Sequence, residues 1–239
     1  MKTANKISAL LLSLAIAAMA QYSSGPVANG GSISGVVKTK GKPPADEEKI
    51  VHKNAETCGA KIAAQKYVVS AAGEVEWAVV SLDGITAGKK IDAPTDLVFT
   101  NTNCHFVPHV LVAPMGANLK VRNDDDMLHN SHFYLVEGAT KKNLINMALP
   151  KKGQIIENAK ILRKDGLVAV NCDAHDFMQG YIFVSPTPYA VVTDAKGSFK
   201  MTDVPVGTYK LKVWHEGLGE KTVSVTVVAG KDAKVSVEL

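Results

Sequence analysis

The stretch GLVAVNCDAHDFMQGYIFV, residues 166–184, decides much of how this chain folds and what it can bind. Two apolar runs rich in Val and Ile enclose a short polar loop that contains Cys172, His175 and Met178. Runs of this length and composition favour strands. The pattern therefore predicts a strand, a tight loop and a returning strand. The loop would present a thiol, an imidazole and a thioether at intervals of three residues.

Similar strand patterns extend along most of the 239 residues. Alternation is strict in YKLKVW (209–214) and TVSVTVV (222–228), which is typical of sheets with one wet face. Two segments have helical character, part of residues 43–65 and residues 140–154, which Pro150 interrupts. We therefore expect an all-β protein made of two sandwich-like units. A seam in composition lies at SPTPY, residues 185–189.

The N-terminus reads as a signal peptide over residues 1–20. A basic start with Lys2 and Lys6 precedes the apolar ISALLLSLAIAAMA, which ends in a small-residue cleavage site. No later run reaches the roughly 20 residues of a spanning helix, so the mature chain is expected to have no integral membrane segment and to be periplasmic or secreted. Residues 21–30 are polar and contain Gly, which predicts a flexible tether.

The composition excludes some functions. The hydrophobic content of 46% supports real cores, and 21% charged residues is ordinary for a soluble protein. The formal charge is only +4, and no Lys/Arg cluster is interleaved with aromatic residues. Nucleic acid binding therefore has no support.

Three cysteines in an exported chain should divide into one disulfide and one free thiol. Cys172 has His and Met neighbours, whereas Cys58 and Cys104 have no comparable thioether nearby. We therefore expect a Cys58–Cys104 disulfide, worth about 4 kcal/mol in the chain-entropy estimate. A bound metal would explain why Cys172 stays unoxidised.

The donors in the loop are those of a type 1 copper site, which needs a thiolate, two imidazoles and a weak thioether contact. The fourth donor has to come from a neighbouring strand, and His129 in RNDDDMLHNSHF (122–133) is placed to provide it. A second metal site is not expected. His105 and His109 would lie about 13 Å apart on an extended strand, and His132 should face away from His129.

Two motifs resemble the cupredoxin family. FVPHVLVAPMGANLKVRNDDDMLHN (106–130) is similar to its Phe-x-Pro, Gly-turn and Asn-x-Asp pattern leading into His-Asn, and CDAHDFMQG (172–180) resembles the amicyanin ligand loop. The resemblance implies a Greek-key β-sandwich with one type 1 copper. Asp176 stands where amicyanin-like loops carry proline, and it adds charge beside the edge through which electrons would pass. The resemblance implies the ligands His129, Cys172, His175 and Met178, with Asn130 bracing the ligand loop.

Asp124, Asp125 and Asp126 directly precede this His-Asn pair. We expect a turn with solvated carboxylates. The alternative is an acidic rim near the metal that steers a basic partner.

The C-terminal segment YAVVTDAKGSFKMTDVPVGTYKLKVWHEG (189–217) resembles the carboxypeptidase regulatory-like, or prealbumin-type, sandwich. Asp194 and Gly197 would form its hairpin turn, with Phe199 and Tyr209 as core anchors. This division assigns residues 31–184 to the cupredoxin domain with an N-terminal extension and residues 185–239 to the smaller β-sandwich. Strand 32–38 either extends the cupredoxin sheet or completes the C-terminal unit.

Together these features predict an exported copper protein that carries single electrons and is not an enzyme. His175, on an exposed loop, would be the point of electron exchange. The expected partner is a redox protein such as a c-type cytochrome or a dehydrogenase. The alternative is a copper-binding or storage protein, or a surface-binding protein that uses the cupredoxin fold as a scaffold.

Overall fold

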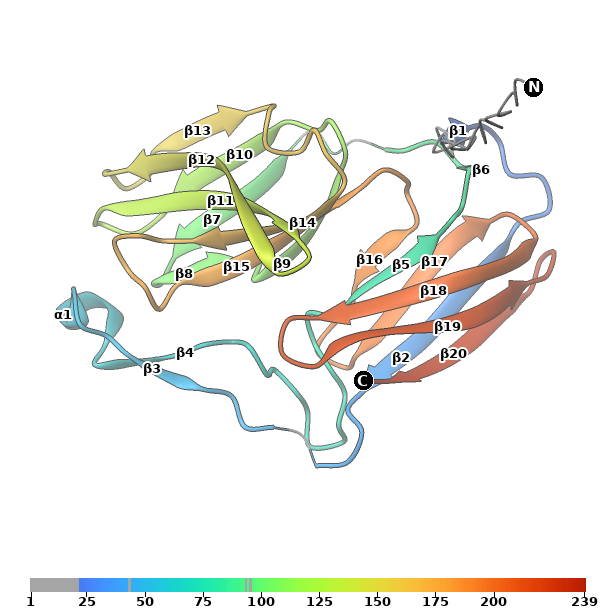
Figure 1. The fold of residues 1–239 in the computed structure, drawn as a ribbon, viewed down its shortest axis with the longest axis horizontal. Coiled ribbons are helices and arrows are strands. Elements are labelled where there is room, and N and C mark those ends of the chain that lie inside the picture. Colours follow the sequence, from blue (N-terminus) through green and yellow to red (C-terminus); the bar gives the residue numbers. More distant parts are fainter. Residues whose placement is uncertain (1–21, 43, 93, 95) are drawn as a thin grey trace, which may run out of the picture.

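Two β-sandwich units lie side by side (Figure 1). The computed structural model describes residues 22–42, 44–92, 94 and 96–239, so the predicted signal peptide at 1–20 lies outside the described residues. Within these ranges, α1 (Ala55–Cys58) is a single helical turn and the other regular elements are strands. The predicted all-β class is confirmed.

The first unit, drawn in green, yellow and light orange in Figure 1, contains two sheets. The four-stranded sheet consists, in pairing order, of β13 (Ile155–Asn158), β10 (Leu119–Asn123), β7 (Leu97–Thr102) and β8 (His105–Val107). The five-stranded sheet consists of β12 (Thr140–Leu149), β11 (His129–Glu137), β14 (Gly166–Asn171), β15 (Gln179–Ser185) and β9 (Val110–Pro114).

Aromatic side chains from both sheets fill the centre of this unit. Phe99 stacks on Phe106 with ring centroids 5.2 Å apart and meets Phe133 at 6.4 Å. These side chains are fully buried in one continuous cluster that also contains Cys172 and Met178. The ligand loop is therefore rooted in the hydrophobic core of the sandwich.

The second unit also contains two sheets. One consists of β16 (Ala190–Val192), β5 (Val79–Asp83), β18 (Gly207–His215) and β19 (Gly219–Val227). The other consists of β17 (Ser198–Val204), β2 (Gly31–Lys38) and β20 (Asp232–Glu238).

Two strands that precede the first unit in sequence thus belong to the second. β2 pairs with β17 and β20, as one of the two alternatives for strand 32–38 required. β5 pairs with β16 and β18, which corrects the assignment of all residues 31–184 to the first unit. The physical reason is burial, because Ile33, Val37 and Val80 are fully buried in the core of the second unit. The first unit is an insertion between β5 and β16.

The predicted hairpin turn of the second unit is present. Asp194 accepts hydrogen bonds from the backbone amides of Lys196 and Ser198 through Oδ1, at 2.8 and 2.9 Å. Gly197 has φ 65°, a left-handed conformation that glycine adopts without strain. Phe199 is buried, and the Tyr209 ring packs against the same core.

The two units share an apolar interface. Val79 of β5, Val110 of β9, and Ala169 and Tyr181 on the outer face of the five-stranded sheet form one buried cluster. The Tyr181 ring meets Trp214 of β18 edge-on at 5.2 Å. Because this contact is buried and aromatic, the units are packed together rather than merely tethered.

Three local expectations need correction. Residues 140–149 form β12 rather than a helix, because they pair with the whole length of β11. Part of the predicted tether is anchored, since β1 (Ser23–Ser24) pairs with β6 (Ala87–Gly88) and the Tyr22 hydroxyl donates to Lys89 O at 2.6 Å. Only α1 remains of the predicted helix at 43–65, flanked by the paired β3 (Glu48–Ile50) and β4 (Lys61–Ala63).

None of the helices among the described residues has the length and apolar character needed to cross a membrane.

Candidate metal centre

Strand pairing brings the distant parts of the candidate site together. β11 runs antiparallel to β14, with His132 opposite Asn171, and β14 returns as β15 with Asn171 opposite Gln179. The loop of residues 172–178 therefore closes at the end of the sheet where β11 begins. His129 is the first residue of β11, so it lies beside this loop although 43 residues separate it from Cys172.

Backbone hydrogen bonds hold the loop in a compact turn. The Cys172 amide donates to Met178 O at 3.3 Å, the His175 amide donates to Cys172 O at 3.3 Å, and the Met178 amide donates to His175 O at 3.0 Å. The C-x-x-H-x-x-M spacing thus gives two successive turns whose ends meet. The positions of Cys172 and His175 are set by the backbone, before any metal contributes.

Three donor atoms, two from this loop and one from His129 of β11, lie close together. Cys172 Sγ lies 3.9 Å from His129 Nδ1 and 3.7 Å from His175 Nδ1. All three donor atoms lie within 4.8 Å of one another, and all three residues are buried. Metal bonds of about 2.0–2.3 Å in a near-trigonal arrangement separate the donors by about 3.7 Å. The donor set and its spacing fit a bound copper ion.

Met178 occupies the same end of the sandwich. Its backbone closes the ligand loop, and its side chain is 2% exposed within the core cluster that contains Cys172. Its role as an axial ligand stays a prediction from the sequence.

Asn130 of β11 contacts the loop. Its Oδ1 accepts the Ala174 amide at 3.0 Å, and its own amide donates to Cys172 Sγ at 3.4 Å. Nδ2 donates to Asn146 Oδ1 of β12 at 2.8 Å. These bonds fix the sulfur relative to the strand that carries His129, which is the usual work of residues outside the ligand set.

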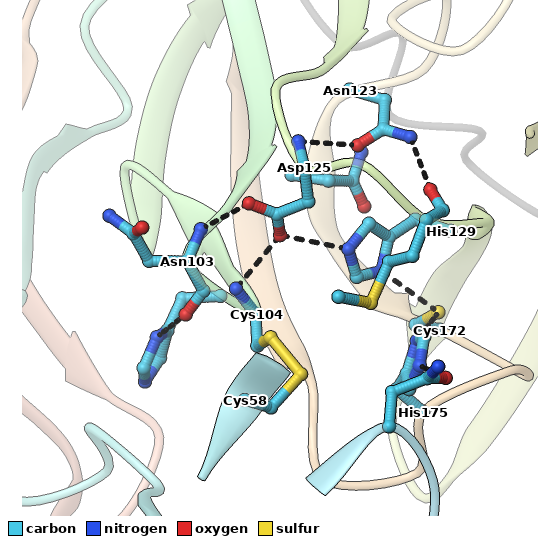
Figure 2. A network of polar contacts seen from close by, with 12 residues as sticks. Cys58, Asn103, Cys104, Asn123, Asp125, His129, Cys172 and His175 are labelled. Atoms are coloured by element: carbon cyan, nitrogen blue, oxygen red, sulfur yellow. Dashed lines mark hydrogen bonds and ion pairs between the residues drawn. A yellow bond between two sulfur atoms is a disulfide. The ribbon is translucent and has the colours of Figure 1, made fainter. Parts of the chain in front are cut away.

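Asp125 holds the far side of the His129 ring. Its Oδ2 lies 2.9 Å from His129 Nε2, and its carboxylate also accepts the amides of Asn103 at 2.7 Å and Cys104 at 2.9 Å (Figure 2). An imidazole that donates from Nε2 keeps the Nδ1 lone pair free, and here Nδ1 faces the sulfur. Burial raises the pKa of Asp125, but the two amides and His129 outweigh it and hold that pKa below its ordinary value.

This contact corrects the interpretation of the three aspartates. Asp125 is nearly buried and Asp124 pairs with Arg122 at 2.6 Å. Only Asp126 is exposed in the manner expected for a solvated turn. The prediction from the sequence therefore did not include Asp125 among the residues of the site. Its spacing of four residues from His129 was the available signal, but it becomes informative only when the chain turns between them.

His175 is also covered, which corrects its role as an exposed point of electron exchange. The side chain is 2% exposed, and its Nε2 lies 2.9 Å from Asn54 Oδ1. Asn54 precedes α1, and Cys58 at the end of α1 forms the predicted disulfide with Cys104. The predicted disulfide could have indicated Asn54. It brings the segment around Cys58, which includes Asn54, next to Cys104, and Cys104 lies just before the cupredoxin-like motif.

Burial sets the protonation of the metal-free site. It is the main cause that lowers the pKa of His175 to about 4, with the charges of His129 and Lys53 adding to it. Burial likewise lowers the pKa of His129 and raises that of the Cys172 thiol. The imidazoles are therefore neutral at pH 7 with lone pairs available, whereas the thiol has to release a proton to bind a metal.

The remaining histidines do not join this centre. His132 contacts Asp173 at 2.9 Å on the outer face of β11 and stacks on Tyr134. His109 pairs with Glu216 at the interface of the two units. Among the described residues, His129, Cys172 and His175 form the one group of three or more His, Cys, Asp or Glu side chains close enough to share a metal ion.

The first unit is a two-sheet β-sandwich with a buried His-Cys-His group at one end, the arrangement that the resemblance to cupredoxins implied, and it is joined to a second β-sandwich. Residues 181–239 match the family model described as the carboxypeptidase regulatory-like domain.

Part of this chain is similar to solved structures of copper proteins. A mutant of amicyanin in its reduced Cu(I) form is 18% identical over 44% of this chain and 98% of that chain, with a TM-score of 0.33. A purple cupredoxin from Nitrosopumilus maritimus is 21% identical over 38% and 100%, with a TM-score of 0.31. The copper-containing nitrite reductase NirK from Thermus scotoductus SA-01 is 21% identical, with a TM-score of 0.32.

The match to the nitrite reductase covers 41% of this chain and only 24% of that chain. A search of curated proteins found no match. The likeness of the first unit to cupredoxins therefore depends on the strand pairing and the donor geometry described above.

Proposed function

We propose that this protein binds one copper ion through His129, Cys172 and His175, with Met178 as the axial ligand, and that it carries single electrons between redox partners. The observation that carries the proposal is the convergence of two Nδ1 atoms on the Cys172 sulfur at 3.7 and 3.9 Å inside the core. When bound, copper would supply the one-electron Cu(II)/Cu(I) couple.

The protein residues would keep the donors in place in both oxidation states. Asn130 fixes the sulfur, and Asp125 and Asn54 each hold one imidazole from its Nε2 side. Burial of all three donors excludes water from the centre. Little rearrangement would therefore accompany the gain or loss of an electron, which is the physical requirement for fast transfer.

We propose a partner such as a c-type cytochrome or a dehydrogenase. Because Asn54 covers His175, an electron would have to pass over the segment around Asn54 or leave from the Cys172 side. Asp173, next to Cys172, is half-exposed and contacts His132. The acidic-rim hypothesis is weakened, because Asp124 and Asp125 are engaged within the protein.

Export to the periplasm or beyond is part of the proposal. Its basis is the apolar sequence of residues 1–20. The Cys58–Cys104 disulfide supports it, because such bonds persist in oxidising compartments.

Copper storage or binding without electron transfer is the second candidate function, and one observation favours it. His175 is 2% exposed, so the metal centre is closed on the side where exchange with a partner was expected. The carboxypeptidase regulatory-like unit would then serve for attachment, as the scaffold alternative supposes.

Voltammetry of the copper-loaded protein distinguishes the two candidates. An electron carrier should give a reversible one-electron wave and exchange electrons with small mediators or a c-type cytochrome. Cys172→Ser should abolish the wave. Copper that is bound but cannot be reversibly reduced and reoxidised would reject the carrier and favour storage.

A further inference from the structure

A segment outside both sandwiches crosses to the metal-site end of the first unit. We call residues 46–67 the strap. It contains β3, α1 and β4, and in Figure 1 it leaves the second unit and reaches α1 beside the first. Its base is closed by Asp46, whose carboxylate accepts the amides of Gln65 at 2.8 Å and Tyr67 at 2.9 Å.

Apolar and covalent contacts fix the far end of the strap to the first unit. Val51 and Ile62 are buried in the core that contains the ligand loop. His105 Nε2 lies 3.2 Å from Ala63 O. The disulfide joins Cys58, at the end of α1, to Cys104, between β7 and β8. The strap is therefore attached at the point where it passes the metal centre.

Asn54 is the residue of the strap that reaches the centre. It lies one helical turn before Cys58, whose amide donates to Asn54 O at 2.9 Å. Its backbone is left-handed, with φ 59° and ψ 35°, a conformation that asparagine tolerates better than most residues. This backbone aims Oδ1 at His175 Nε2, 2.9 Å away. The His175 ring thereby turns Nδ1 toward Cys172.

The two histidines are held in parallel ways. Asp125 accepts from His129 Nε2 as Asn54 accepts from His175 Nε2. The single disulfide connects these two holders, because Asp125 also accepts the Cys104 amide (Figure 2). The Nε2 side of each imidazole ring is thus held by a residue that is linked to one half of the Cys58–Cys104 cystine.

We propose that Asn54 is a positioning residue for His175 and that the strap, held by Cys58–Cys104, is a cap over the His175 edge of the metal centre. The cap fixes the ring before metal arrives and keeps solvent and large partners from its Nε2 edge. This inference concerns the same centre as the proposed function. Its tests use metal-free protein, so each can fail without the other.

The direct readout is the Nε2–H proton of His175, followed by NMR of ¹⁵N-histidine-labelled, metal-free protein at pH 7. In the wild type this proton should exchange slowly with solvent. Asn54→Gly removes the acceptor without backbone strain, because glycine also accepts positive φ. Exchange should then accelerate about fivefold or more, the factor that corresponds to one net hydrogen bond of about 1 kcal/mol.

Two variants and one internal signal serve as controls. Gln65→Gly also replaces a positive-φ residue of the strap (φ 59°), away from the centre, and should leave the exchange rate unchanged. Asn54→Asp retains the acceptor oxygen and should restore slow exchange. The Nε2–H proton of His129, which Asp125 holds, should stay protected in all three variants.

The disulfide is tested with the double variant Cys58→Ser, Cys104→Ser. Rapid exchange at His175 with continued protection at His129 is expected, because Asp125 keeps its contacts within the first unit. Wild-type exchange at His175 in both Asn54→Gly and this double variant would overturn the proposal. Equal acceleration in Gln65→Gly would also overturn it, since the effect would then reflect general loosening of the strap.

Discussion

The Nε2 atom of His175 lies 2.9 Å from the Oδ1 atom of Asn54, 121 residues earlier in the chain. This contact places a polar side chain where a cupredoxin-like centre was expected to meet solvent. Access to the metal centre therefore depends on the strap as well as on the sandwich.

Met178→Leu should retain copper and raise the reduction potential, because losing the thioether donor favours Cu(I). A shift of about 60 mV or more is expected, a tenfold change in relative affinity for a one-electron couple. Voltammetry measures it. Met147→Leu is the matched control, since it removes another buried thioether from the same core and should leave the potential unchanged. Complete loss of copper in Met178→Leu would contradict a purely axial role.

Asp125→Ala should weaken copper binding by about 10–100-fold, because the Asp125 carboxylate orients His129 and selects the Nε2–H tautomer. Competition with a chelator of known affinity measures the effect. Asp126→Asn changes an exposed neighbour in the same turn and should bind copper like the wild type. Equal losses in the two variants would assign the effect to local charge rather than to the hydrogen bond.

Removing the disulfide with Cys58→Ser, Cys104→Ser should lower the free energy of unfolding by about 2–4 kcal/mol. The bond closes a separation of 46 residues, for which the chain-entropy estimate gives about 4 kcal/mol. Urea unfolding of the metal-free protein measures the change. A loss below about 1 kcal/mol would mean that contacts such as buried Val51 and Ile62 fix the strap without help.

His215 should make stability fall in mild acid. Burial, followed by the charge of His109, lowers the pKa of His215 from 6.5 to about 4. In the unfolded chain His215 therefore binds a proton near pH 6.5, whereas in the folded protein it binds that proton only near pH 4. The stabilisation is complete above pH 6.5 and is lost as the pH falls toward 4, by up to about 3 kcal/mol.

His215→Asn is the matched variant for this effect. Its Oδ1 can accept the amides of Gly217 and Leu218 as His215 Nδ1 does, at 3.2 Å, and it does not titrate. Urea unfolding between pH 4 and 7.5 should give a steeper loss in the wild type than in the variant. Parallel curves would show that other groups control acid sensitivity.

The strands and the candidate donors of the ligand loop could be proposed from the sequence because both signals are local. Period-two alternation identifies β18 and β19, and the spacing of Cys172, His175 and Met178 within one loop leaves few ways to arrange them. His129 follows from the motif that ends in His-Asn. The disulfide follows from exclusion of the one cysteine with metal-binding neighbours.

The sheet that a strand joins, and the residues that cover the metal centre, are harder to predict because both depend on contacts between distant parts of the chain. Alternation indicates that β2 is a strand but not which sheet it joins, and the burial of Ile33 in the second core decides it. Asp125 looked like a solvated turn residue because three adjacent aspartates are usually exposed. Asn54 gave no signal of its own, since its contact depends on the path of the whole strap.

The most direct test of the account is addition of Cu(II) to the metal-free protein, with copper counted per chain and the visible spectrum recorded. One equivalent should bind and produce an intense thiolate-to-copper band, and Cys172→Ser should abolish that band. A pale, amine-like copper spectrum in the wild type, or an intense band that survives Cys172→Ser, would contradict a centre built on His129, Cys172 and His175.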